Sequence, residues 1–190
     1  MTRGARRAAR VTLAVVLAVA GARCAGAIDA THVRREADET TSYDVQRVAL
    51  GALFNGRERA QRLVLWESDA EDGPALEALR STLPRARTSH RIDLARLAPS
   101  LPARTLTEAA VADLFRKNPD GWAAFFRENP GSSGLVELSP VWLSGDGDSA
   151  TTHIGRSCGE HCRNAWRVSA RRMGSRWTVT DVQWVRVPGS

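Results

Sequence analysis

The sequence predicts an α+β protein in which N-terminal helices pack on one face of a C-terminal four-stranded antiparallel meander. Three observations predict this class. Apolar residues recur at helical spacing in the first two-thirds of the chain, the pattern changes to strand alternation after Gly134, and turn residues separate the alternating segments. A run of helices followed by a run of strands is typical of α+β folds, whose helices gather on one side of an antiparallel sheet.

The first 27 residues have the order of segments found in a secretory signal peptide. Residues 1–10 contain four arginines and no acidic residue, residues 11–20 are apolar, and Ala25-Gly26-Ala27 supplies small residues for cleavage. The apolar run is about half as long as a helix that spans a bilayer. We therefore predict cleavage after Ala27, export to the periplasm or the exterior, and no transmembrane anchor after cleavage. Arg6-Arg7 leaves open whether the general or the twin-arginine route is used.

Removing this leader changes the interpretation of the charge. The full chain has 27 basic and 21 acidic residues, a net charge of +6, but five of the arginines lie within residues 1–27. The mature chain would therefore carry 22 basic against 21 acidic residues and be nearly neutral. The charge of the precursor gives no indication of nucleic-acid binding, and we expect none.

Residues 28–41 are polar and predict a flexible lead, and residues 42–190 are long enough for a single α+β domain. Ser42 is the predicted N-cap of the first helix, which the pattern ends near Asn55-Gly56. The further expected elements are a strand at 61–67 and helices at 74–83, 107–115 and 120–128. Residues 85–104 mix arginine, proline and few apolar residues, so a strand, a helical turn and a loop all stay open for them.

Four segments after Gly134 predict the strands of the meander: 135–143, 150–155, 165–172 and 176–187. The alternation is clearest in the third of them. Trp166, Val168 and Ala170 would point to one face of the sheet, and the residues between them would point to the other. This pattern indicates an antiparallel sheet with one face packed on a core.

Cys158 and Cys162 are the cysteines that remain after the predicted cleavage. Two cysteines in an oxidising compartment favour a disulfide, which here would bridge a short hairpin. Two alternatives stay open. A metal site would draw on His153, Cys158, His161 and Cys162, although this spacing is a weak pattern for zinc, and a redox centre would lack the usual two-residue spacing. We expect no cofactor.

Arginines are dense near the C-terminus, where residues 151–190 hold seven arginines and two acidic residues. Arg163, Arg167 and Arg171 share one face of the third predicted strand. Such a row is suited to an anionic component of the cell envelope, such as an acidic polymer or lipid head groups. The alternative is a row of solvated side chains on the outer face of the sheet.

From Trp122 onward the chain resembles a group of exported bacterial proteins of unknown function. An aromatic helix there precedes a P-G-S-x-G turn, an L-S strand, a C-G-x-x-C-like hairpin and a closing G-x-W segment with a final W-V. The corresponding residues are Phe126, Pro130-Gly131-Ser132, Gly134, Leu138-Ser139, Cys158-Gly159, Cys162, Gly174, Trp177 and Trp184-Val185. The match departs from that pattern in the three residues between the cysteines. The resemblance implies export and a shared fold, and it brings no activity.

The C-terminal G-x-W and W-V segment is also similar to the last hairpin of nuclear-transport-factor-2-like cones. This similarity implies a concave sheet with a pocket as the alternative fold.

Taken together, the sequence predicts an exported, non-catalytic binding or accessory domain of the cell envelope. Its partner would be an anionic envelope component or another envelope protein. The alternatives are a small metal-dependent or pocket-based hydrolase or lyase, in which His153 and His161 would act with a carboxylate, and a structural interaction protein.

Overall fold

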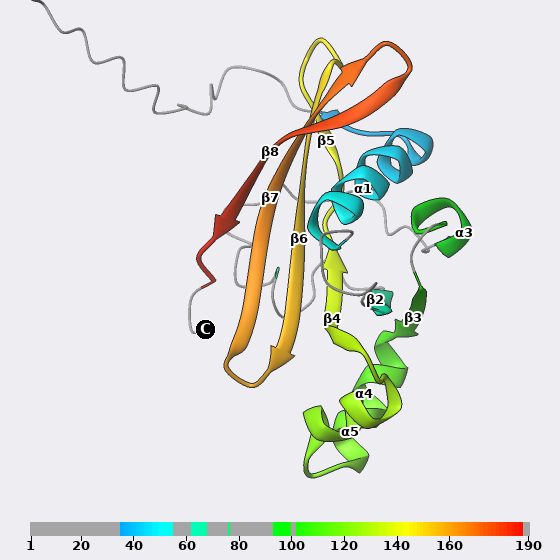
Figure 1. The fold of residues 1–190 in the computed structure, drawn as a ribbon, viewed down its shortest axis with the longest axis vertical. Coiled ribbons are helices and arrows are strands. Elements are labelled where there is room, and N and C mark those ends of the chain that lie inside the picture. Colours follow the sequence, from blue (N-terminus) through cyan, green and yellow to red (C-terminus); the bar gives the residue numbers. More distant parts are fainter. Residues whose placement is uncertain (1–34, 55–61, 68–75, 77–92, 100–101, 188–190) are drawn as a thin grey trace, which may run out of the picture. The chain divides into compact units, whose positions relative to one another are not determined.

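The computed structural model describes residues 35–54, 62–67, 76, 93–99 and 102–187, all within one compact unit, Thr31–Ser190 (Figure 1). The predicted signal peptide and the helix expected at 74–83 lie outside the described residues, apart from Leu76. The helices are α1 (Glu39–Phe54), α3 (Leu94–Leu97), α4 (Glu108–Lys117) and α5 (Gly121–Glu128). The strands are β1 (Arg35–Glu36), β2 (Arg62–Glu67), β3 (Ala103–Thr107), β4 (Ser132–Leu138), β5 (Trp142–Leu143), β6 (Ser149–Gly159), β7 (Cys162–Met173) and β8 (Arg176–Val185).

The described strands form one mixed, eight-stranded sheet in which β6 is the central strand. Along one edge β6 pairs with β7, which in turn pairs with β8, and both pairings are antiparallel. Along its other edge β6 pairs with β4 and β5, also antiparallel. β2 then lies between β4 and β3 and is parallel to both. Figure 1 shows the long β6–β7–β8 meander with α1 lying against it.

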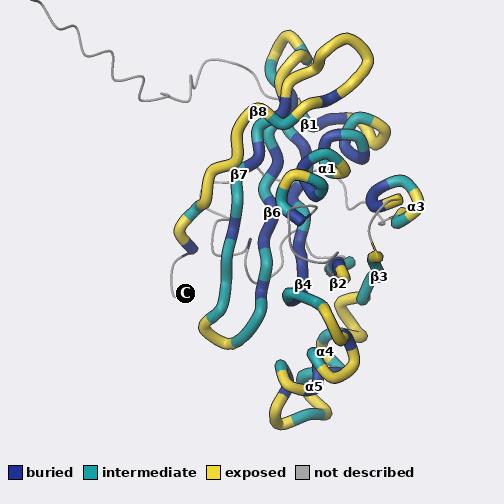
Figure 2. The backbone as a smooth tube through the Cα atoms, in the orientation of Figure 1, coloured by how far each residue is buried: buried dark blue, intermediate teal, exposed yellow. Residues whose placement is uncertain are grey.

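Helices cover both faces of this sheet, as the side chains of β2 show. Leu63 and Leu65 pack in a core cluster with Leu50 of α1 and Leu97 of α3. Val64, which lies between them, packs with residues of α4 and α5 in a separate cluster. Successive side chains of a strand point to opposite faces, so the two helical layers lie on opposite sides of β2. Figure 2 shows the resulting burial of β4 and β6 and the exposure of much of β8.

The predicted fold class, helices on one face of a four-stranded antiparallel meander, is therefore wrong. The sheet is mixed, it has eight strands, and α4 and α5 cover the opposite face from α1. The alternation that predicts the meander detects β6, β7 and β8, but it carries no information about strands that pair across long stretches of chain.

The local predictions agree with the structure more closely than the topology does. α4 and α5 lie within two residues of their expected bounds, and the predicted 135–143 strand is divided at Ser139-Pro140 into β4 and β5. Within the segment predicted as a flexible lead, Arg35–Glu36 form β1 and α1 begins at Glu39. Within the segment left without assignment, 85–104, the structure has the short helix α3, and β3 begins at Ala103. No helix in the described part of the chain has the length and apolar character needed to cross a bilayer.

Asp38, rather than Ser42, caps the start of α1. Its carboxylate accepts hydrogen bonds from the Thr41 backbone N–H at 2.8 Å and from the Thr41 hydroxyl at 3.1 Å. The bond from the Thr41 N–H is the main reason why the pKa of Asp38 lies below its usual value. A carboxylate at the N-cap position satisfies a backbone donor that would otherwise lack a partner in the helix.

We expect Asp38→Ala to lower the free energy of unfolding by about 1 kcal/mol at neutral pH. Because the pKa is lowered in the folded state, the stabilisation is complete above the ordinary aspartate range, near pH 4, and is lost as the pH falls through the folded pKa. Urea denaturation of both proteins across this range measures the effect. Asp44→Ala, which removes only an exposed ion pair with Arg47, is the control. A difference independent of pH would contradict the assignment of the cap.

Candidate functional site: a cavity between the helical corner and the hairpin tip

The corner between α4 and α5 brings aromatic rings to the surface of the sheet. Thr107 caps α4, and its side chain accepts a hydrogen bond from the Ala110 N–H. α5 starts at Gly121, where an added Cβ would lie 2.5 Å from the Phe115 ring. The absence of a side chain at Gly121 therefore permits Phe115 to pack against the start of α5. There Phe115 meets Trp122 edge to face, with ring centroids 5.0 Å apart.

The β6–β7 hairpin provides the opposite side of the site. β6 ends at Gly159 and β7 begins at Cys162, so Glu160 and His161 form an exposed turn. Cys158 and Cys162 lie at disulfide distance, with their Cα atoms 5.0 Å apart. The predicted pairing of these two cysteines thus agrees with the positions of their side chains. A cross-link here would close the turn that carries Glu160 and His161.

Gly134 in β4 aligns the hairpin with the rest of the sheet. Its backbone has a φ of +129°, a conformation that residues with a side chain rarely adopt. An added Cβ would lie 2.3 Å from the Ser157 carbonyl oxygen and 3.1 Å from the Cys158 Cβ. The absence of a side chain at Gly134 therefore allows β4 to approach β6 closely beside the hairpin tip.

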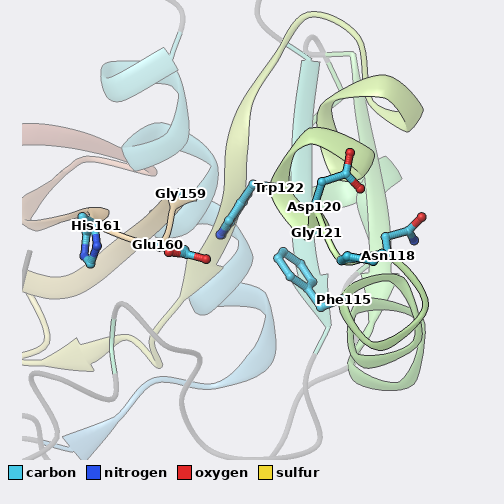
Figure 3. Close-up of a pocket in the computed structure, with 9 residues that line it drawn as sticks. Phe115, Asn118, Asp120, Gly121, Trp122, Gly159, Glu160 and His161 are labelled. Carbon is cyan, nitrogen blue, oxygen red and sulfur yellow. The ribbon is translucent and has the colours of Figure 1, made fainter.

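A cavity of about 580 Å³ lies between the corner and the hairpin tip (Figure 3). Its lining consists of two aromatic rings, two carboxylates, an imidazole, an amide and small residues. These residues are Phe115, Asn118, Pro119, Asp120, Gly121, Trp122, Gly159, Glu160 and His161. The volume falls within the range of pockets that bind small molecules. The two walls come from segments about forty residues apart in the sequence, so local sequence patterns could not predict the cavity.

The two carboxylates of the cavity differ in their partners. Asp120 accepts a hydrogen bond from Arg127 at 2.8 Å, and this contact holds the pKa of Asp120 below its usual value. Glu160, in the exposed turn, makes no salt bridge with any other described residue. Neither lysine nor arginine is among the described residues that line the cavity. Among the described lining residues, Glu160 is therefore the carboxylate that makes no ion pair.

The residues considered for a metal site do not converge. His161 lines the cavity at the hairpin turn. His153 lies in the middle of β6, opposite Arg167 in the register of β6 with β7. Cys158 and Cys162 face each other. Within the described ranges, no group of three or more histidine, cysteine or acidic side chains is arranged to hold a metal ion.

The arginine row lies along β7, outside the cavity. Arg163, Arg167 and Arg171 pair across to Ser157, His153 and Ser149 of β6, at positions that place them on one face of the sheet. Arg167 donates a hydrogen bond to the Gln183 side chain at 2.6 Å. Arg167 is thus bonded to a side chain of the neighbouring strand β8, whereas Arg171 is exposed.

The sequence does not single out two charged residues of the sheet, one buried and one half-buried. Glu137 of β4 is 3% exposed and accepts hydrogen bonds from the Ser157 hydroxyl and from the Leu76 N–H. Arg156 is half-buried, its guanidinium lies 5.4 Å from the centre of the Trp166 ring, and burial lowers its pKa. The sequence does contain a signal for the burial of Glu137. It is the single charged residue in the otherwise apolar strand segment Leu135-Val136-Glu137-Leu138.

Comparison with known proteins does not add to this site. No protein-family model matches the chain, no curated protein matches its sequence, and no solved structure matches its fold.

Replacing both Cys158 and Cys162 by serine should lower the free energy of unfolding by about 2 kcal/mol, because a disulfide across so short a loop removes little conformational entropy from the unfolded chain. Urea denaturation of the oxidised protein, with the reduced wild-type protein as control, measures the loss. Alkylation followed by mass measurement reports the state of the thiols. If both cysteines were alkylated without a reductant, the disulfide would be excluded.

Proposed function

We propose that this chain is an exported, non-catalytic binding domain of the cell envelope, and that its ligand binds in the cavity between the α4–α5 corner and the hairpin tip. The observation that carries the proposal is the cavity itself. Two aromatic rings and several polar groups, supplied by two separate elements, line an open pocket of about 580 Å³. A lining that combines aromatic rings with polar groups able to orient a ligand is suited to a small molecule.

Export is supported by the leader-like segment at residues 1–27 and by the cysteine pair. The segment has the basic, apolar and small-residue order of a signal peptide. Cys158 and Cys162 lie at disulfide distance, and disulfides persist in oxidising compartments. Expression of the full chain in a bacterium with a periplasm, followed by intact-mass measurement of each cell fraction, tests this part. Full-length protein confined to the cytosol would overturn it.

Binding at the cavity is tested by nuclear magnetic resonance titration of the exported protein with small envelope compounds, namely amino sugars, short peptidoglycan fragments and soluble lipid head groups. A ligand of the cavity should shift the signals of residues 115–122 and 159–161. The matched comparison is the set of signals from the arginine row, Arg163, Arg167 and Arg171. Signal shifts confined to the arginine row would show that the ligand binds there and not in the cavity. Conversion of any compound to a product would contradict the non-catalytic role.

A further inference from the structure

We infer that the cavity selects a small organic cation, of the alkylammonium type, over neutral and anionic molecules of the same shape. This inference rests on the proposed function, because it takes the cavity to be the binding site. It adds the chemical class of the ligand, which follows from the charges and the rings that line the cavity.

The charge of the lining favours a cation. Asp120 and Glu160 are its two carboxylates, and no lysine or arginine is among the described lining residues. Asp120 is balanced by Arg127, which lies 2.8 Å away. Glu160 has no such partner among the described residues, and Figure 3 shows its carboxylate extending toward the side of the cavity that holds Trp122. Because the Glu160 carboxylate is exposed and makes no ion pair with a described residue, it is available to pair with a positively charged ligand.

The nearest cations of α4 do not supply it. Arg116 and Lys117 precede the lining residue Asn118, yet neither lines the cavity. Both contact the Asp113 carboxylate, Lys117 at a distance of 2.7 Å. Their side chains therefore form ion pairs on the surface of α4.

The aromatic rings provide the second part of a cation site. Trp122 and Phe115 are nearly perpendicular, with an interplanar angle of 76°. Trp122 also meets Phe125, which is fully buried, at 5.4 Å, so its position is fixed by the core. The face of an indole attracts organic cations more strongly than any other side-chain ring does. A methylated ammonium group can use both the ring and the carboxylate, because its charge is spread over an apolar surface.

The experiment compares choline with 3,3-dimethylbutan-1-ol, its neutral isostere, and with 3,3-dimethylbutanoate, an anion of similar shape. Each is titrated into the exported protein at pH 8, where histidine side chains are ordinarily neutral. The indole N–H signal of Trp122, assigned through Trp122→Phe, reports binding. We expect choline to bind at least about fivefold more tightly than its neutral isostere, in line with the strength of cation–π contacts.

Glu160→Gln should reduce the preference for choline by about threefold, as expected for a carboxylate at an exposed site. Glu128→Gln, which removes the same charge from an exposed position of α5 outside the lining, should leave it unchanged. Equal or stronger binding of the neutral or anionic probe would overturn the inference while leaving the cavity as a binding site. Absence of binding by all three probes would also overturn the inference, and the titration with envelope compounds would then decide the proposed function separately.

Discussion

Gly134→Ala should lower the free energy of unfolding by about 3 kcal/mol or more, the largest effect that we expect from a single methyl group in this protein. Two costs combine. The backbone at Gly134 has a φ of +129°, and an added Cβ would lie 2.3 Å from the Ser157 carbonyl oxygen. That oxygen belongs to the backbone of β6, so it cannot move aside without disturbing the pairing of β4 with β6.

Gly131→Ala separates these two costs. Gly131 lies in the turn just before β4 and has a φ of +78°, but nothing lies within 4 Å of the position of its Cβ. This variant should lose only about 1 kcal/mol, the ordinary cost of a left-handed conformation for a residue with a side chain. Urea denaturation of the two variants and the wild-type protein gives the comparison. Equal losses would show that the close approach to Ser157 contributes nothing.

Glu137→Leu should lower the free energy of unfolding by about 3 kcal/mol. Glu137 is almost fully buried in β4, and its two carboxylate oxygens accept from the Ser157 hydroxyl at 3.2 Å and from the Leu76 N–H at 3.0 Å. A leucine side chain would leave both buried donors without these acceptors. The loss of an acceptor from a buried donor costs more than the hydrogen bond contributes when it is intact.

Two further variants test this explanation for Glu137. Glu128→Leu replaces an exposed glutamate of α5 and should change the stability by less than about 0.5 kcal/mol. Ser157→Ala should cost less in the Glu137→Leu background than in the wild-type protein, because the hydroxyl that it removes already lacks its acceptor. Additive effects of the two substitutions, measured by denaturation, would exclude a coupled pair.

The sequence predicts those parts of the fold that depend on neighbours along the chain. Alternation locates β6, β7 and β8, helical spacing locates α1, α4 and α5, and the cysteine spacing identifies a pair at disulfide distance. Pairing between distant segments has no such signal. Leu63-Val64-Leu65 is an uninterrupted apolar run, which is typical of a strand buried on both faces, but its partners β3 and β4 cannot be deduced from it.

The candidate site was predicted only in part for the same reason. His161 and the two cysteines come from one hairpin, so the sequence places them close together, although their pattern is a weak one for a metal site. The opposite wall of the cavity is the corner around Phe115 and Trp122, which comes from a distant segment. The sequence shows this segment only as a helix that is broken at Asn118-Pro119. The arginine row was predicted from alternation, and the structure places it on one face of β7, where it remains a candidate for anion binding.

The position of β2 between β3 and β4 has a consequence for how the chain acquires its structure. The β6–β7–β8 hairpins join neighbouring segments, whereas β2 must find partners that follow it much later in the sequence. Closing long loops costs chain entropy before any contact compensates for it, and proteins rich in such contacts reach the native state slowly. We therefore expect the hairpins to assemble first and the docking of β2 to limit the refolding rate.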